Sequence, residues 1–301
     1  MTIPLNRASY VDDNNRLGMI KVSGLDMSSD VSTAVTAASM SFSATQVGQF
    51  SMTVIDSPDA QLLTSGMFGP GTLIDWADQH LEVRSIDFQS GGGGPQLAVK
   101  ARSRSISTLR GAGQSGKASW GDCDVSQWVR DRCGEGGATA VVQPDLGRQT
   151  ITRQQNEGTV QTTWDVMQAL AKTVGCVCYE FEQVVTFARP SWLTDISRAR
   201  RWELVWNGNG SYTAGMVGFP SYSWSADSTP PGEESLSVEL LSDDADQARP
   251  GDRLILAGSV GMAYGLWMLV DVTIPLSTTA PVKVTCKRAT DPAPVASTMG
   301  V

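Results

Sequence analysis

The sequence predicts a mainly β protein of the α+β class, in which two similar β-barrels bracket a small α/β domain. The first reason is composition: 30 glycines and 14 prolines, with many serines and threonines, favour short strands and turns. The second is that apolar residues alternate along much of the chain with the period of two that half-buried strands need. The third is a repeat, because a strand–turn pattern follows Pro70-Gly71 and occurs again after Pro250-Gly251.

Residues 1–110 form the first predicted barrel in a chain of 301 residues, which is long enough for two or three domains. Apolar residues alternate over 40–44 and again over 50–54, which predicts two strands. Within 81–88 the alternation changes phase by one residue, and a slip of this kind indicates a β-bulge. The Gly-rich residues 90–96 then predict the tip of a hairpin.

Residues 111–190 are predicted to form the small α/β domain, because two helical patterns replace the alternation there. The residues that favour the ends of these helices are Asp124 and Gly134 for the first, and Thr162, Asp165 and Gly175 for the second. The second helix carries an apolar stripe from Trp164 to Val174. A strand hairpin follows it and ends at Pro190.

Residues 191–301 are predicted to form the second barrel, which begins with a Trp-rich stretch and ends in a frayed C-terminal tail. The tryptophans of the entry stretch are Trp192, Trp202, Trp206 and Trp224. Turns are predicted at 207–210 and 228–234, and four strands follow the second of these turns.

The repeat extends beyond the two Pro-Gly turns. In both copies a proline opens the last strand and an arginine stands seven residues later; these are Pro95 with Arg102, and Pro281 with Arg288. In the preceding strand Val83 aligns with Val270, and they lie twelve and eleven residues before their respective prolines. We interpret the two copies as a duplicated β-barrel, with chance similarity between strand–turn patterns as the alternative.

Three groups of motifs carry a resemblance over roughly residues 40–292. The first barrel contributes FSMTVIDS, FGPGTLIDW and VKARSRS; the middle contributes SQWVRDRCGE and TTWDVMQALAKTVGCVCYEFEQVVTFARP; the second barrel contributes GDRLILAG, WMLVDVTI and KVTCKRATDP. In this order they resemble the phage tail hub family, which includes the late control D proteins and the baseplate hubs of contractile tails. The resemblance implies two tail-tube-like β-barrels around a smaller domain, and a homotrimer whose six barrels close a pseudo-six-fold ring.

The resemblance also implies a function. It is that of a structural minor tail protein, not an enzyme, that closes the tail tube at its distal end and connects it to the tip or baseplate. The implied partners are other copies of the chain, the tail tube or distal tail protein, the tape measure protein, and tip, fibre or spike proteins. DNA is expected only in transit during genome ejection, and the expected location is the virion, after assembly in the host cytoplasm. The chain stops soon after the second barrel, so we expect no peptidoglycan-cleaving extension.

The charge of the chain excludes one class of partner. The net charge is −8 and the pI is about 4.7, whereas a protein that holds the nucleic acid backbone needs a basic surface. An acidic bore would instead let DNA slide without sticking. The sequence has no apolar run long enough to span a bilayer and no secretory signal at its N-terminus, so we expect no stable membrane insertion.

The glycine-rich segment GAGQSGKA, residues 111–118, matches phosphate-binding motifs in its spacing. Lys117 stands where a P-loop has its lysine, but Ala118 replaces the Ser or Thr that holds Mg²⁺. The next helical pattern starts only near Asp124, whereas a phosphate site needs a helix to begin at once. We therefore interpret the segment as a linker and expect no nucleotide or other cofactor.

The sequence indicates no catalytic and no metal site. His80, the only histidine, stands near Asp75 and Asp78, and we interpret it as a surface residue rather than as part of a Ser–His–Asp triad. The five cysteines lack the spacing of a zinc site or of a disulfide framework, so we expect reduced thiols. The acidic residues 243–247 lack the glycine and the glutamate of a calcium loop.

The nine tryptophans leave one alternative function open. Trp128 and Trp164 fall on the apolar faces of the two predicted helices, where core packing explains them. The tryptophans after Pro190 are expected to pack in the core or at a subunit interface, which is also enriched in tryptophan. Exposed rings among them would instead favour a glycan-binding or glycan-cleaving tail-tip module.

Overall fold

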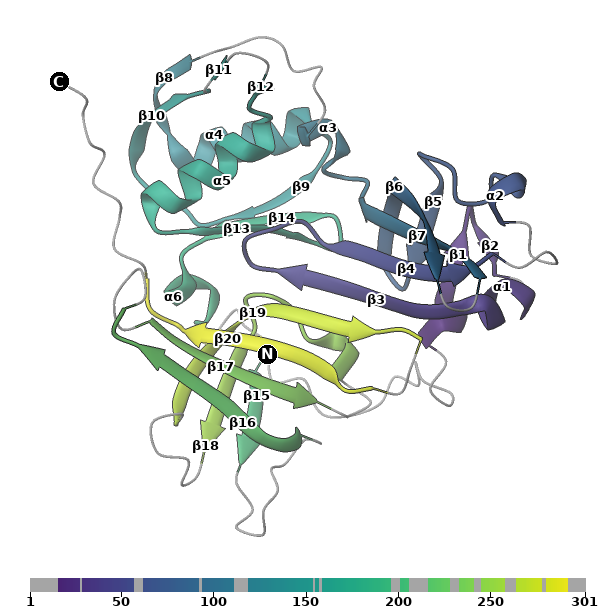
Figure 1. Ribbon diagram of the computed structural model, residues 1–301. Helices are drawn as coiled ribbons and strands as arrows, with labels where there is room; N and C mark the ends of the chain where they lie inside the picture. The colour runs from purple at the N-terminus through teal and green to yellow at the C-terminus, as the bar shows by residue number, and fades with distance from the viewer. Residues whose placement is uncertain are drawn as a thin grey trace.

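The protein has a mainly β fold in three parts (Figure 1). Two curled sheets, here called the first and the second half-sheet, lie side by side, and a small α/β domain packs against both. The fold comes from a computed structural model that describes residues 16–27, 29–56, 62–91, 94–110, 119–153, 155–156, 159–195, 201–205, 216–227, 233–240, 245–257, 264–277 and 280–291. The predicted fold class is confirmed, and in the single chain each predicted barrel is a curled, open sheet.

The elements follow one another in three groups. The first half-sheet contains β1 (Ile20–Val22), β2 (Leu25–Asp26), β3 (Val35–Ser43), β4 (Gln49–Ile55), β5 (Leu73–Trp76), β6 (Gln79–Gly91) and β7 (Gly94–Ser103), with α1 (Ser29–Ala34), α2 (Leu62–Ser65) and α3 (Ser107–Arg110). The middle domain contains β8 (Ser119–Asp124), α4 (Val125–Glu135), β9 (Thr139–Val142), β10 (Arg148–Thr152), β11 (Gln155–Asn156), β12 (Thr159–Val160), α5 (Thr163–Val174), β13 (Val177–Phe181), β14 (Val184–Ala188) and α6 (Pro190–Leu193). The second half-sheet contains β15 (Arg201–Val205), β16 (Met216–Ser225), β17 (Glu233–Leu240), β18 (Arg253–Ala257), β19 (Gly265–Pro275) and β20 (Val282–Arg288).

The two half-sheets have the same strand order. The first runs β3-β4-β7-β6-β5-β1, and the second runs β16-β17-β20-β19-β18-β15. They differ at one end, since β1 is antiparallel to β5 whereas β15 is parallel to β18. An antiparallel pairing of β3 with β19 joins them into one 13-stranded sheet. The shared order supports the duplication that the repeat predicts.

The two Pro-Gly turns are structurally equivalent, and they correct the predicted alignment by one residue. Gly71 and Gly251 have φ angles of 85° and 86°, which favour glycine. Gly71 N–H donates to the carbonyl of Val83 at 3.0 Å, and Gly251 N–H donates to that of Leu269 at 2.9 Å. Both strands then continue through a register shift, which confirms the β-bulge predicted within 81–88. Val83 therefore corresponds to Leu269 and not to Val270.

The two arginines of the predicted alignment are not equivalent either. Arg102 lies opposite Glu82 on the neighbouring strand, whereas Arg288 lies opposite Trp267. The second hairpin is one residue shorter between its bulge and its last strand. Equal spacing from a proline therefore places the two arginines at different positions of the sheet.

The middle domain packs α4 and α5 on a three-stranded sheet of β13, β14 and β9 (Figure 1). The predicted caps Asp124, Thr162 and Gly175 are confirmed, and Thr162 forms a capping box with Asp165. The predicted end of the first helix at Gly134 is wrong, because α4 continues to Glu135 and its C-cap is Gly136. Gly134 is tolerated inside the last turn, while Gly136 and Gly137 leave the helix.

Three hydrophobic clusters hold these parts together. The largest runs without interruption across both half-sheets, and the second fills the middle domain. The third is small and joins the middle domain to the second half-sheet through Tyr179, Met268 and Val270. The Tyr179 hydroxyl donates to the carbonyl of Pro250 at 2.8 Å, and the ring closes over Gly251.

The tryptophans take different roles. Trp128 and Trp164 are buried in the middle domain, as predicted for the two helices. Trp202 is half-buried and donates from Nε1 to Asp252 Oδ2 at 2.9 Å, and Trp192 packs partly against the third cluster. Trp224 is exposed. Trp206 lies outside the described residues, as do the segment 111–118, the predicted turn at 207–210, most of that at 228–234, residues 243 and 244, and nearly all of the C-terminal tail.

We expect Trp164→Ala to lower the free energy of unfolding by about 3–5 kcal/mol, because it empties a large site in a close-packed core. The exposed ring of Tyr264 provides the matched control, and Tyr264→Ala should change the free energy by less than about 0.5 kcal/mol. Urea denaturation of both variants measures the difference. Equal midpoints for the two variants would contradict the packing described for Trp164.

We also expect Gly251→Ala to destabilise the protein more than Gly71→Ala. Both positions have the same positive φ, so each substitution carries a backbone strain of about 1–2 kcal/mol. At Gly251 the added Cβ would also collide with the Tyr179 hydroxyl, whereas at Gly71 the nearest side-chain atom is at 3.8 Å. The melting temperatures of the two variants check this, and a similar loss in both would remove the role given to Tyr179.

Candidate functional site: two unpaired sheet edges

The junction between β3 and β19 shows what a completed edge looks like in this fold. Residues 39–43 pair antiparallel with 271–275, with Phe42 opposite Val272 and Met40 opposite Ile274. These four side chains are buried, and Ala44 N–H extends the ladder by donating to the carbonyl of Val270 at 2.7 Å. On the other face the hydroxyls of Ser41 and Thr273 lie 3.4 Å apart.

Because the half-sheets share one topology, each strand of the junction has a counterpart. The counterpart of β19 is β6, and the bulges align its residues 85–89 with 271–275. The counterpart of β3 is β16, and residues 221–225 correspond to 39–43. This second alignment rests on equivalent residue pairs. Tyr222 lies opposite Leu236 on β17, and Met40 lies opposite Phe50 on β4, which is the counterpart of β17 in the first half-sheet.

Neither counterpart pairs with another described strand on the edge that the junction uses. Among the described residues, β6 pairs with β7 along its length and with β5 only at residues 79–82, which leaves one edge of 85–89 open. Of the strands that the structure describes, β16 pairs only with β17. These two segments, 85–89 and 221–225, are the candidate site, and we call them the open edges.

Large aromatic side chains on the open edges are exposed where the junction buries its own. Phe88 corresponds to Ile274, and 57% of its surface is exposed against 0% for Ile274. Trp224 corresponds to Phe42, and 54% of its surface is exposed against 2% for Phe42. Phe219, earlier on β16, is also exposed. Unpaired strand edges with exposed apolar side chains are ready templates for pairing with another chain.

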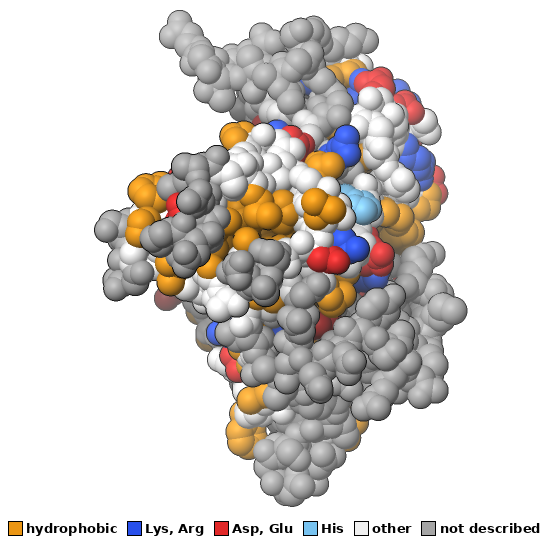
Figure 2. All heavy atoms as spheres, turned by 90° about the vertical axis from the view of Figure 1, so that its right-hand side faces the viewer, with side chains coloured by type: hydrophobic (Ala, Val, Ile, Leu, Met, Phe, Trp, Pro, Cys, Tyr) orange, Lys and Arg blue, Asp and Glu red, His pale blue; other side chains and the backbone are white. Residues whose placement is uncertain are grey.

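The face of the first half-sheet carries further apolar surface. Figure 2 views the molecule from this side and shows hydrophobic side chains grouped near the pale-blue histidine. Leu25 on β2 is among the exposed large hydrophobic residues of this half. His80 itself is exposed, and its Nδ1 lies 2.7 Å from Asp75 Oδ1, whereas Asp78 is exposed in the adjoining turn. No triad geometry is formed around His80 by the described residues.

The cysteines that were considered for chemistry are mostly buried. The five cysteines are free, and burial raises the pKa of Cys133 and of Cys176 to about 12, so these thiols are poor nucleophiles. The described residues contain no group of three or more side chains placed to hold a metal ion. They also contain no helix long and apolar enough to cross a membrane.

A buried carboxyl lies where the middle domain meets the first half-sheet. Glu180 on β13 accepts a hydrogen bond from Ser103 Oγ at 2.9 Å and another from the backbone N–H of Gln183 at 2.6 Å, both at Oε1. A bridge between Val47 and Glu180 connects the two parts at this point. Burial of the side chain raises the pKa of Glu180 to about 7.

The fold is shared with solved phage tail proteins. The 43 kDa tail protein of prophage MuSo2 from Shewanella oneidensis is similar over 90% of this chain and 96% of its own, with a TM-score of 0.60 and 10% identity. A tail protein from Neisseria meningitidis MC58 is similar over the same shares, with a TM-score of 0.61 and 10% identity. The E. coli c3393 protein, a type VI secretion component with structural similarity to the T4 tail proteins gp27 and gp5, covers 91% of this chain and 79% of its own, with a TM-score of 0.55 and 12% identity.

No family model and no curated protein matches the sequence. The structural likeness nevertheless spans nearly the whole chain, and it confirms the predicted resemblance at the level of fold. The chain has the fold of phage tail hub-like proteins. The sequence analysis did not identify the open edges. The signal that could have found them is the phase change at 81–88, because it places the apolar Phe88 beyond a bulge, on a strand for which the sequence predicts no second neighbour.

We expect the stability of the protein to fall with rising pH because of Glu180. Its carboxyl has a higher pKa in the folded chain, about 7, than in the unfolded chain, so folding favours the protonated form. This contribution is fully present below the ordinary glutamate pKa and is lost as pH rises through 7. Between pH 4.5 and 8 the wild type should therefore lose roughly 3 kcal/mol relative to Glu180→Gln.

Urea denaturation at a series of pH values measures this difference. The control is Glu135→Gln, which makes the same substitution at an exposed acid on α4. A Glu180→Gln variant that follows the wild type at every pH would show that the carboxyl is solvated in the folded chain.

Proposed function

We propose that this chain is the structural hub protein at the distal end of a phage tail. In this proposal three copies close a ring that continues the tail tube, and DNA passes through the ring without being held. The observation that carries the proposal is the match between the internal β3–β19 junction and the two open edges. The chain contains one completed junction and offers both edges of a second one. Copies of the chain can therefore associate head to tail through these edges.

The equivalence specifies the contact between copies. Residues 85–89 of one copy pair antiparallel with 221–225 of the next, with the register of the internal junction. Phe88 then lies opposite Tyr222, and Ile86 lies opposite Trp224. The exposed aromatic side chains become buried as their counterparts are, and the two strand edges exchange backbone hydrogen bonds.

The contact is heterologous, because one copy offers β6 and the other offers β16. Repeated contacts of this kind give a closed ring when the rotation closes and an open filament when it does not. In a ring of three chains, internal junctions alternate with junctions between chains, and six half-sheets surround one axis. This arrangement is the one implied for the hub family, whose fold the chain shares.

The remaining partners follow from this position. The two faces of the ring would contact the tail tube or distal tail protein on one side, and tip, fibre or spike proteins on the other, with the tape measure protein along the axis. The net charge of −8 supports a bore that repels the DNA backbone. The proposal gives the chain no catalytic residue and no cofactor, and places it in the virion after assembly in the host cytoplasm.

A glycan-binding tail-tip module is the second candidate, and exposed aromatic rings favour it. Trp224 and Phe219 project from β16 and offer flat surfaces on which a sugar could stack. The two candidates differ in what happens to Trp224 on assembly. The ring buries it against Ile86 of the next copy, whereas a glycan platform keeps it exposed in the assembled tail.

We expect an Asp87→Cys, Ser223→Cys variant to form disulfides between copies. These positions correspond to Thr273 and Ser41, which face each other across the internal junction outside the core. Under mild oxidation the variant should give covalent dimers and trimers on a non-reducing gel, with no species beyond the trimer. The matched control is Asp87→Cys with Ser221→Cys, which moves one cysteine by two residues on the same strand face and should cross-link far less.

Mass measurement of the unmodified protein in solution completes the test. A trimer with cross-links at the expected register supports the proposal. A chain that stays monomeric at high concentration and forms no cross-links, or one that forms a ladder extending far beyond three copies, would overturn it.

A further inference from the structure

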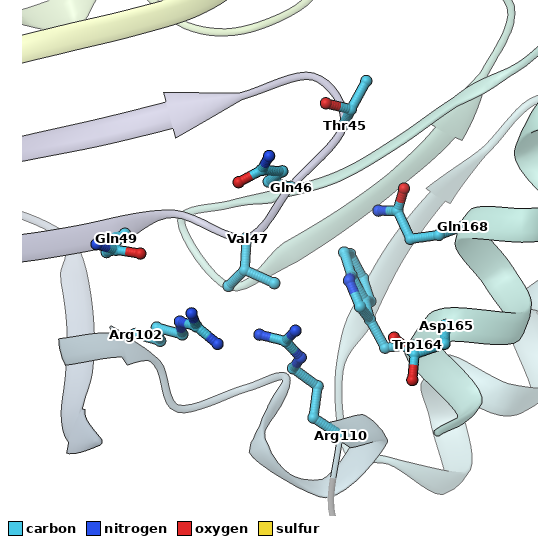
Figure 3. Close-up of a pocket in the computed structure, with 9 residues that line it drawn as sticks. All are labelled: Thr45, Gln46, Val47, Gln49, Arg102, Arg110, Trp164, Asp165 and Gln168. Atoms are coloured by element: carbon cyan, nitrogen blue, oxygen red, sulfur yellow. The ribbon is translucent and has the colours of Figure 1, made fainter. Parts of the chain in front are cut away.

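Three arginines surround a depression beside the open edge of β6. Arg84 on β6, Arg102 on β7 and Arg110 on α3 line a cavity of about 290 Å³ in the first half-sheet. A neighbouring cavity of about 200 Å³ shares Arg102 and Arg110 (Figure 3). In Figure 3 the guanidinium groups of these two residues lie close together below Val47, and Asp165 is the only carboxylate drawn. We call the three residues the arginine cluster.

The positive charge of the arginine cluster is only partly balanced by the described residues. Arg84 donates to Glu82 Oε2 at 3.1 Å, but Arg102 and Arg110 have no hydrogen-bond or ion-pair partner among the described residues. Burial lowers the pKa of Arg110 and the neighbouring Arg102 lowers it further, whereas Asp165 raises it; the net shift is downward. Such an arrangement is unusual in a chain of net charge −8.

Asp165, which lines the neighbouring cavity, is already engaged. Asp165 Oδ2 accepts hydrogen bonds from the backbone N–H of Thr162 at 2.9 Å and from its hydroxyl at 2.7 Å, in the capping box of α5. The sequence that follows Arg110, residues 111–118, contains no acidic residue. The anion that completes the arginine cluster must therefore come from elsewhere.

The internal junction indicates where that anion lies. Arg84 is the bulge residue of β6, and its counterpart on β19 is Val270. At the internal junction Val270 packs with Ala44, whose N–H binds its carbonyl, and Thr45 follows directly. On β16 the counterparts of Ala44 and Thr45 are Ala226 and Asp227.

Asp227 is suited to this contact. Its side chain is exposed in the turn after β16, and its carboxylate has no hydrogen-bond or ion-pair partner among the described residues. The three other acids of this hairpin are engaged, since Glu233 pairs with Lys287, Glu234 pairs with Arg288 and Glu239 pairs with Lys283. Asp227 is therefore the one acid of the hairpin left to make a contact outside it.

We propose that the arginine cluster is a binding site for the Asp227 carboxylate of the next copy in the ring. This inference rests on the proposed function, because it uses the contact between β6 and β16. Paired guanidinium groups match a carboxylate in charge and geometry. A small cavity in an acidic chain fits one side chain better than it fits a nucleic acid backbone. The ion pair fixes the register of the open edges, since a slip by two residues separates the charges.

Charge reversal tests this site. We expect Asp227→Arg and Arg102→Glu each to weaken the association of the trimer by about tenfold or more, because each places like charges together at the contact. The double variant Asp227→Arg, Arg102→Glu should recover most of the loss by restoring an ion pair with reversed sense. The control is Asp131→Arg on α4, which makes the same change of charge at an exposed site away from the open edges.

The measurement needs no added ligand. The association constant of each variant comes from mass photometry over a range of protein concentrations, at low salt and at high salt. The single-variant losses should shrink at high salt, where exposed charges are screened. Melting curves of the variants check that each remains folded, and Arg102 and Asp227 are both exposed enough for reversal to be tolerated.

The outcomes separate this inference from the proposed function. If the wild type forms trimers and the edge cysteines cross-link, but the charge reversals change nothing or the double variant recovers nothing, the ring stands and the Asp227 site is overturned. If the wild type stays monomeric without cross-links, both are overturned. Binding of a DNA oligonucleotide by the wild type, lost in Arg102→Glu, would identify a phosphate site and would also overturn the inference.

Discussion

The antiparallel pairing of β3 with β19 is the contact on which the rest of the architecture depends. It joins two half-sheets of the same topology into one sheet, and the main hydrophobic cluster runs across the join. The middle domain then spans the junction, with Tyr179 fixed over Gly251 on one side and Glu180 bonded to Ser103 on the other. Loss of this pairing would leave two small sheets with open edges and divide the core.

The duplicated halves have diverged most where their surroundings differ. The internal junction is apolar, with Phe42, Val270 and Ile274 buried in it. At the corresponding positions on the open edges the chain has Trp224, Arg84 and Phe88, which combine aromatic bulk with charge. Contacts between folded chains commonly mix these features, since aromatic side chains and arginine are enriched at interfaces and charge improves specificity. The divergence therefore matches the proposed division between a contact inside the chain and a contact between chains.

The sequence predicted what depends on neighbouring residues and missed what depends on distant ones. The caps of α5 and the bulge after Val83 are set by local chemistry, and both were predictable. The end of α4 was misplaced at Gly134, because one glycine can remain in a helix when two more follow it. The β3–β19 pairing and the arginine cluster join segments far apart in the chain, and no spacing in a single sequence encodes them.

The covalent link between the two half-sheets also affects how an assembly would begin. Six separate half-sheets would have to find one another in solution and lose translational freedom at every junction. Here every second junction already forms when the chain folds, because the tether holds β3 and β19 at a high effective concentration. The proposed ring would be asymmetric in one respect, because its wall of six similar half-sheets would carry only three middle domains, one for each tethered pair. Such a ring would present six-fold surfaces to one neighbour and three-fold surfaces to another, which is the property of a symmetry adaptor.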